Sequence, residues 1–201
     1  WAVGEEDDDE FASITGSWET DLRNAVSAHD FAGVRRALMG SQRTGGRSAL
    51  TRLMATADND GQSALHLCAT GGGKASVEAW TRSPGLYRTA PGRTGPALGD
   101  GERIVELLVE ARARVNATNM LGESPLLAAV RAPASPGLVR ALLQRGADPD
   151  HLDALTGETA LMEAACSGSS DLCLVLLQAR ADPLCRNPQG QTASDLALAA
   201  G

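Results

Sequence analysis

Apolar residues recur along most of the chain in short groups, and each group follows a glycine and a hydroxyl residue. After Gly61 the chain reads Gln-Ser-Ala-Leu-His-Leu-Cys-Ala, and related octets follow Gly122, Gly157 and Gly190. A hydroxyl side chain can accept the free amide hydrogens of a helix N-terminus. The pattern therefore predicts a short helix after each glycine, and the residues expected to begin the first three are Ser63, Ser124 and Thr159.

A second apolar group with paired leucines follows each of the first three helices. These groups lie at residues 104–108, 138–143 and 172–177. The four glycines are 61, 35 and 33 residues apart, so the basic period is close to 33 residues with additions in the earlier units. A two-helix unit of this kind leaves an apolar face open and is stable only when it is stacked on a neighbour. We therefore expect an all-α repeat architecture.

The order of these landmarks resembles the ankyrin repeat, which reads Gly-x-Thr-Pro-Leu-His-x-Ala-Ala, a turn, a helix ending in Leu-Leu, and Gly-Ala-Asp. The resemblance covers about residues 59–201. It implies an ankyrin-repeat solenoid of stacked helix-turn-helix units with short finger turns, and a function in binding other proteins. His66 falls on the His of this pattern, where the resemblance implies hydrogen bonds that brace the adjoining turn.

The period and its departures divide the chain into six segments. Phe31, Val34 and Leu38 have the spacing of a helix ahead of the repeats, in what looks like a degenerate first unit. The expected segments are an acidic N-terminal arm (1–19), a capping repeat with a connection from about residue 41 (20–58), a repeat with a long insertion at about 73–100 (59–118), two further repeats (119–152 and 153–186) and an incomplete C-terminal repeat (187–201).

The insertion separates the two helices of the first full repeat. Leu65 and Leu108 are 43 residues apart, whereas the equivalent Leu161 and Leu176 are 15 apart. The inserted residues carry Trp80, Tyr87 and several arginines, which are residue types that anchor protein interfaces. Two interpretations remain open, because long surface loops cost little closure entropy: a tolerated surface excursion, or an arm that contacts a partner.

Arginine replaces glycine at two helix ends. Arg112 and Arg180 stand where the third copy has Gly146, a position that favours left-handed backbone geometry. Either the helices run on slightly, or the two arginines accept some strain.

Charge and composition exclude two classes of function. The net charge is −7, but residues 5–10 supply six of the negative charges and leave a nearly neutral body without the basic surface that nucleic-acid binding requires. No apolar stretch approaches the ~20 residues of a membrane-spanning helix. The four cysteines lack the dense framework of a secreted disulfide-rich domain. We expect reduced thiols in the cytoplasm or an organelle interior, and the chain starts at Trp1 rather than at Met, so a removed targeting segment fits this expectation.

Candidate chemistry is sparse. Cys166 and Cys173 are seven residues apart and fall on different predicted helices, and no spacing typical of a metal site occurs. His29 and His151 lack a nearby nucleophile pattern, and the glycine clusters lack the Lys-Ser/Thr of a phosphate-binding loop. We therefore predict no enzyme, no catalytic residue, no cofactor and no metal site.

The resemblance instead implies partner binding through the finger turns and the inner helices. The residues expected to contact a protein partner are Met120, Leu121, Leu155, Thr156, Pro188 and Gln189 at the turns, Leu127, Arg131, Met162, Glu163 and Cys166 on the inner helices, and Trp80 and Tyr87 in the insertion. An alternative function is a structural or accessory subunit of a large, organellar complex, anchored by the N-terminal arm and the insertion. In either case the half-built last repeat exposes leucines such as Leu198, and we expect further chain or a partner to cover them.

Overall fold

The computed structural model describes residues 20–44, 61–70, 99–132 and 135–200 of the chain. Residues 20–27 are helical, and no described residue lies in a strand. The helices are α2 (Phe31–Thr44), α4 (Ala64–Thr70), α6 (Asp100–Glu110), α7 (Pro125–Arg131), α8 (Pro136–Gln144), α9 (Ala160–Cys166), α10 (Ser170–Gln178) and α11 (Ala193–Ala200).

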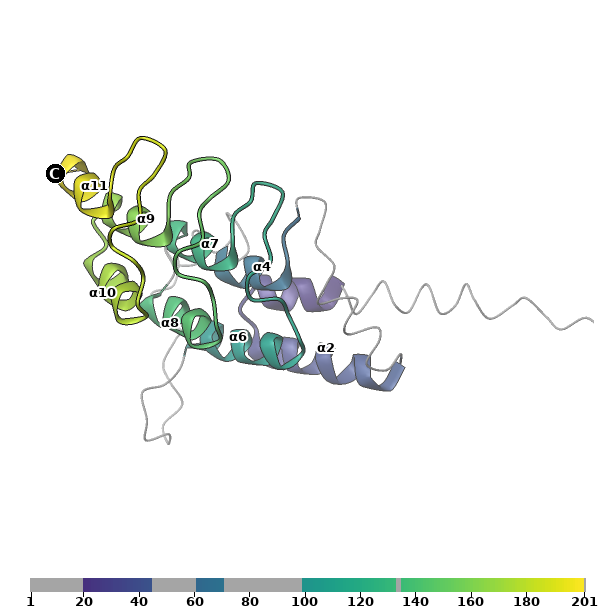
Figure 1. Ribbon diagram of the computed structural model, residues 1–201. Helices are drawn as coiled ribbons and strands as arrows, with labels where there is room; N and C mark the ends of the chain where they lie inside the picture. Colours follow the sequence, from purple (N-terminus) through teal and green to yellow (C-terminus); the bar gives the residue numbers. More distant parts are fainter. Residues whose placement is uncertain (1–19, 45–60, 71–98, 133–134, 201) are drawn as a thin grey trace, which may run out of the picture.

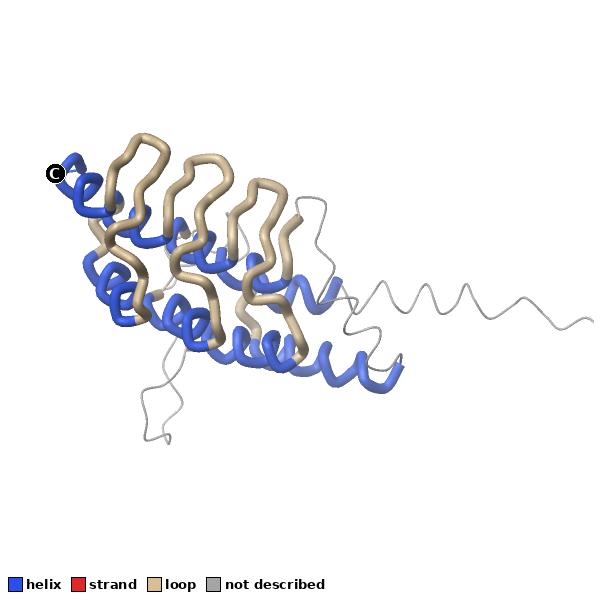
Figure 2. Tube along the Cα trace, viewed as in Figure 1, coloured by secondary structure: helices blue, strands red, loops and turns tan. Residues whose placement is uncertain are grey.

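The helices form two parallel rows (Figure 1). An inner row contains α4, α7, α9 and α11, and an outer row contains α2, α6, α8 and α10; neighbours within each row pack on one another, and the pairs α4–α6, α7–α8 and α9–α10 pack across the rows. The loops that lead into the inner helices project as a row of fingers (Figure 2). The expected all-α solenoid with finger turns is confirmed for this part of the chain.

The core lies between the two rows and runs through the repeats. The leucines at equivalent places in the inner helices, Leu65, Leu126 and Leu161, are buried, as are Leu108, Leu142 and Leu176 of the outer helices. Small residues such as Ala129 and Ala164 are fully buried between neighbouring inner helices, which allows the helices to approach closely. The core register predicted from the sequence is therefore correct for these repeats.

Hydroxyl side chains begin two of the inner helices as expected. Ser124 Oγ accepts a hydrogen bond from the backbone N–H of Leu127, and Thr159 Oγ1 accepts one from the N–H of Met162, both at 3.3 Å. Pro125 follows Ser124 in the first turn, where its missing N–H leaves no donor unpaired. Ser63 differs, because its side chain contacts the ring of His66.

The outer helices end in left-handed residues. Gly146, Arg112 and Arg180 have φ angles of 89°, 72° and 67°. In α10 the N–H of Arg180 donates to the carbonyl of Leu177, and the N–H of the next residue donates to the carbonyl of Leu176. This is the Schellman arrangement that normally favours glycine. The helices therefore do not run on past these positions. Arg112 and Arg180 instead adopt the unfavourable left-handed geometry.

Replacing Arg180 by glycine is expected to raise the free energy of unfolding by about 0.5–1 kcal/mol. A side chain in the left-handed region costs about 1–2 kcal/mol, and the greater freedom of glycine in the unfolded chain offsets part of that gain. Chemical denaturation of Arg180→Gly measures the change, with Arg140→Gly as a control because Arg140 lies inside α8, where glycine destabilises. A less stable Arg180→Gly would contradict the assigned strain.

Two boundaries differ from those expected. Helix α2 continues through Thr44, so residues 41–44 belong to it and not to the connection. Helix α6 begins at Asp100, which the sequence placed at the end of the insertion. Asp100 and Glu102 occupy its first turn, where negative charge is favourable at the positive end of the helix dipole. The rest of the connection and most of the insertion lie outside the described residues.

Leucines are exposed at the C-terminal end of the stack. Leu174 and Leu177 on α10 and Leu198 on α11 are exposed, whereas Leu172 and Leu176 are buried. The expected uncovered surface is therefore present on α11 and on one side of α10. Within the described residues, none of the helices combines the length and apolar character needed to cross a bilayer.

Candidate functional site: the finger face

Residues 61–70, 119–131, 153–166 and 187–200 form one face of the stack, made of fingers and inner helices, which we call the finger face. An asparagine closes two of its fingers. Asn119 Oδ1 accepts hydrogen bonds from the N–H groups of Leu121 and Glu123 at 3.0 Å, and Asn119 Nδ2 donates to Glu123 Oε2 at 3.0 Å. Asn187 Oδ1 accepts from the N–H of Gln189 at 3.1 Å. These short-range bonds hold the turns in one conformation.

The middle finger uses an aspartate and is one residue longer. The N–H of Asn119 donates to the carbonyl of Glu123, four residues on, whereas the N–H of Asp153 donates to the carbonyl of Glu158, five residues on. Asp153 Oδ2 accepts from the backbone N–H of Thr156 at 3.3 Å and from its hydroxyl at 2.9 Å.

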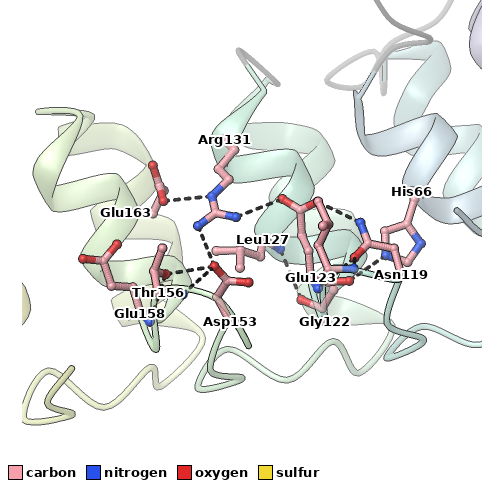
Figure 3. Close-up of polar contacts among 12 residues, drawn as sticks. His66, Asn119, Gly122, Glu123, Leu127, Arg131, Asp153, Thr156, Glu158 and Glu163 are labelled. Carbon is pink, nitrogen blue, oxygen red and sulfur yellow. Dashed lines mark hydrogen bonds and ion pairs between the residues drawn. The ribbon is translucent and has the colours of Figure 1, made fainter. Parts of the chain in front are cut away.

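Arg131 joins two repeats at the base of this finger (Figure 3). Its Nη2 lies 3.0 Å from Asp153 Oδ2, its Nε lies 3.0 Å from Glu163 Oε2, and its Nη1 lies 3.4 Å from Glu123 Oε1. The three carboxylates come from the finger and inner helix on either side of the guanidinium. Each of the three guanidinium nitrogens therefore faces a carboxylate of the protein.

The ion pairs fix the charge state of the buried Asp153 and of Arg131. Burial acts to raise the pKa of Asp153, but hydrogen bonds from Arg131 and Thr156 outweigh it, so the pKa lies below its ordinary value. Burial acts to lower the pKa of Arg131, but its bonds to Glu163 and Asp153 outweigh that effect and raise the pKa. Both groups are charged at neutral pH, which makes the contact a true ion pair.

His66 braces the next finger, as the sequence predicted. The backbone N–H of Ser63 donates to His66 Nδ1 at 3.2 Å, so Nδ1 is the acceptor nitrogen of the ring. His66 Nε2 therefore carries the hydrogen and donates to the carbonyl oxygen of Glu123 at 2.9 Å. A buried imidazole held at both nitrogens positions the turn and is not free to act as a base.

Apolar side chains stand exposed at the tips of the fingers. Met120 is 76% exposed, Leu121 is 53% exposed and Leu155 is 69% exposed. The other residues expected at the turns are also exposed: Thr156, Pro188 and Gln189. Gly122 sits against Ala154 and Gly157 against Pro188 with no room for a Cβ atom, so successive fingers pack closely. The tips thus form one surface rather than separate loops.

The prediction that Leu127 and Met162 contact a partner is wrong. Leu127 and Met162 are only 1% exposed and belong to the core. They occupy the place that His66 takes in the first full repeat, where the side chain points toward the base of the next finger (Figure 3). Two apolar side chains fill this space instead of a hydrogen-bonded ring, so they cannot reach a partner without unfolding the repeat.

The remaining inner-helix residues lie at the surface. Arg131 and Cys166 are exposed and Glu163 is half-buried. Trp80 and Tyr87, the predicted anchors of the insertion, lie outside the described residues. The structure thus brings Arg131 and Glu163 into direct contact beneath the exposed finger tips, and it places Cys166 at the C-terminal end of the same helix as Glu163.

Sequence reasoning missed the carboxylates Glu123 and Asp153. The signal was present, because Asp153 stands at the position of Asn119 and Asn187, and an aspartate at such a position brings a charge that needs a partner. Glu123 follows the turn glycine in the first of these fingers. Neither residue belongs to a recognisable motif on its own.

The other histidines bond to the backbone, and Cys68, Cys173 and Cys185 lie in or against the core. His29 Nε2 donates to the carbonyl of Cys68 at 2.8 Å, and His151 Nε2 donates to the carbonyl of Gly122 at 2.9 Å. Burial raises the pKa of the Cys68 thiol to about 12, so this thiol stays protonated at neutral pH. Across the described ranges, no group of three or more His, Cys, Asp or Glu residues is arranged to hold a metal ion.

Comparison with known proteins agrees with the geometry. The family model of ankyrin repeats in three copies matches residues 97–187. The chain is 32% identical over 164 residues to the E3 ubiquitin-protein ligase KEG of Arabidopsis thaliana, a match that covers 78% of this chain and 10% of that protein. It is 35% identical over 101 residues to the ankyrin repeat and SAM domain-containing protein 6 of Mus musculus, covering 50% of this chain and 11% of that protein.

The protein of the same name from Rattus norvegicus is 34% identical over 101 residues, with the same coverage of 50% of this chain and 11% of that protein. The chain therefore spans about a tenth of the length of the curated relatives that it matches. The two rows of helices, the fingers closed by Asn or Asp, the bracing histidine and these matches lead to one conclusion. The chain belongs to the ankyrin repeat family.

Proposed function

We propose that the chain is a non-catalytic adaptor that receives a partner protein on the finger face. Its ankyrin repeats indicate a protein–protein interaction module. The observation that carries the proposal is the row of exposed apolar tips, Met120, Leu121 and Leu155, which stand on fingers held by their own hydrogen bonds. Contiguous apolar surface on a rigid support is typical of an interaction site.

Rigid fingers favour tight binding. Ordering a loop on association costs free energy, and bonds such as those from Leu121 and Thr156 to the closing residues of their fingers remove most of that cost beforehand. The Arabidopsis relative is a ubiquitin-protein ligase. We do not assign a ligase activity to this chain, because the chain spans a tenth of that protein.

The test is a pair of matched surface variants of the full chain. The double variant Met120→Ser/Leu155→Ser removes two apolar tips, and we expect the amount of endogenous partner that copurifies with it to fall about tenfold or more. Leu174→Ser is the control, because it removes an exposed leucine from the outer helix α10. Both variants should keep the thermal midpoint of the native chain, since the replaced side chains are exposed.

Equal copurification by the tip variant and the native chain would refute the finger face as the binding surface. A stoichiometric complex that survives loss of the tips would instead favour a structural subunit held elsewhere in the chain. Loss of the partner from Leu174→Ser alone would move the interface to the outer helices.

A further inference from the structure

Charge is distributed unevenly between the two faces of the stack. The finger face carries five carboxylates and one arginine, a net charge of −4: Glu123, Asp153, Glu158, Glu163 and Asp195 against Arg131. The outer helices of the three repeats, with their flanking residues 99–112, 135–146 and 169–180, carry five acidic residues and five arginines. The outer helices are thus neutral, and the excess negative charge belongs to the face with the exposed apolar tips.

The one arginine of the finger face does not present a free positive charge. Its three nitrogens each face a carboxylate of the protein, at 3.0, 3.0 and 3.4 Å. The cluster of Arg131, Glu123, Asp153 and Glu163 therefore keeps a net charge of −2 beneath the tips of the fingers. An acidic partner group would meet this excess of negative charge, and the positive charge of Arg131 is already balanced by carboxylates of the protein.

Two carboxylates carry negative charge that the protein does not fully compensate. Asp153 is 2% exposed, and its Oδ1 has no hydrogen-bond partner among the described residues, so it adds negative potential from below the surface without touching a ligand. No ion pair joins the half-buried Glu158 to any side chain that the structure describes, and Figure 3 shows Glu158 at the base of the same finger as Asp153 and Thr156. Negative charge that the protein leaves unbalanced beside an apolar surface fits a ligand that brings positive charge and apolar side chains together.

We propose that the finger face selects a basic partner segment, in which an apolar side chain packs against the finger tips and lysine or arginine side chains face Glu158 and Glu163. This inference rests on the proposed function and adds the chemistry of the partner. Such charge complementarity speeds association and discriminates against neutral and acidic segments that fit the tips equally well.

The probe is a library of short random peptides displayed on phage and selected on the full chain. The Met120→Ser/Leu155→Ser variant serves for counter-selection, so that retained peptides depend on the finger tips. We expect the enriched peptides to combine Leu, Ile, Phe or Met with an excess of Lys and Arg. A synthetic enriched peptide is then titrated against the chain by fluorescence anisotropy.

Matched variants separate the contribution of the carboxylates to peptide affinity from the contribution of the finger tips. Glu158→Gln and Glu163→Gln should each lower the affinity for the peptide about two- to fivefold, as expected for one partly exposed charge pair. Glu110→Gln on α6 removes the same charge from the outer face and should leave the affinity unchanged. The affinity should also fall as salt rises from about 50 to 300 mM, because the charges are screened.

Enriched peptides that need the tips but are neutral or acidic would overturn the charge inference and leave the proposed function standing. The charge inference would also be overturned if Glu158→Gln and Glu110→Gln changed the peptide affinity equally. Peptides that bind the tip variant as well as the native chain, or the absence of any enrichment, would count against both.

Discussion

Replacing Leu126 or Leu161 by alanine is expected to lower the free energy of unfolding by ~2–5 kcal/mol. Both leucines are buried in the first turn of an inner helix that packs against two neighbouring inner helices and its own outer helix. Truncation removes the transfer free energy of the side chain and leaves a cavity that the surrounding helices fill only in part. Urea denaturation followed by helical circular dichroism measures the loss.

Leu155→Ala provides the matched control, because it makes the same chemical change at an exposed finger tip. Its unfolding free energy should stay within ~0.5 kcal/mol of the native value. Changes below ~0.5 kcal/mol in both core variants would show that the core register is wrong. Stacked repeats can also lose two-state behaviour, so the urea dependence of each variant should be compared with that of the native chain.

The second large effect is expected at Arg131. Arg131→Met keeps most of the aliphatic length but leaves the Asp153 carboxylate buried without its cation. A buried charge that loses its hydrogen-bonded partner is strongly unfavourable, and the partial exposure of Arg131 moderates the loss. We expect the free energy of unfolding to fall by ~1.5–3 kcal/mol at pH 7, measured by urea denaturation.

The effect should depend on pH with a defined sign. The Asp153 pKa is lowered in the folded protein from its ordinary value of 3.8, so this ion pair stabilises the fold above about pH 4 and its contribution is lost as the pH falls through the folded-state pKa. The stability difference between the native chain and Arg131→Met should therefore be largest near neutral pH and narrow below about pH 4. A difference that grows on acidification would contradict the ion pair.

Asp153→Asn is the control for this prediction, because asparagine occupies the same place in the fingers of Asn119 and Asn187. In the Asp153→Asn background, which lacks the buried charge, the loss of unfolding free energy caused by Arg131→Met should be at most half of its value in the native chain. A double-mutant cycle of the two changes measures the coupling directly. Independent effects would show that Arg131 stabilises the repeat through packing alone.

The repeat architecture was predictable because it depends on local features that recur along the sequence. The glycine, the hydroxyl residue and the buried leucine recur in order, and each has a local physical role: Gly157 is left-handed, Thr159 begins its helix and Leu161 enters the core. The bracing role of His66 was implied by the resemblance to the ankyrin repeat and not by a local rule, because its partner Glu123 is 57 residues away. Features that repeat along the sequence need no knowledge of distant contacts.

The burial of Leu127 and Met162 was not predictable from helical spacing. An inner helix has neighbours on two sides and an outer helix behind it, so α7 buries nearly every residue from Pro125 to Val130. A surface stripe with a period of 3.6 residues does not exist on such a helix. Exposure begins only at its end, with Arg131.

The Arg131 cluster was also hidden from sequence reasoning. Its partners are 8, 22 and 32 residues away along the chain, and they come together only when two repeats stack. The extra residue of the middle finger can be counted in the sequence between Asp153 and Gly157, but the hydrogen bond from Asp153 to Glu158 that closes the longer turn is seen only in the structure. The proposed binding surface therefore depends on contacts between repeats more than on any one repeat.

Site-specific photo-crosslinking tests the central claim most directly. A photoreactive amino acid is placed at Leu155 on a finger tip, at Leu174 on the outer helix α10 or at Trp80 in the insertion, and the full chain is irradiated in the presence of its endogenous partner. We expect a strong adduct to one partner protein from position 155 and little or none from position 174. Adducts from position 174 or position 80, with none from position 155, would contradict a partner bound on the finger face.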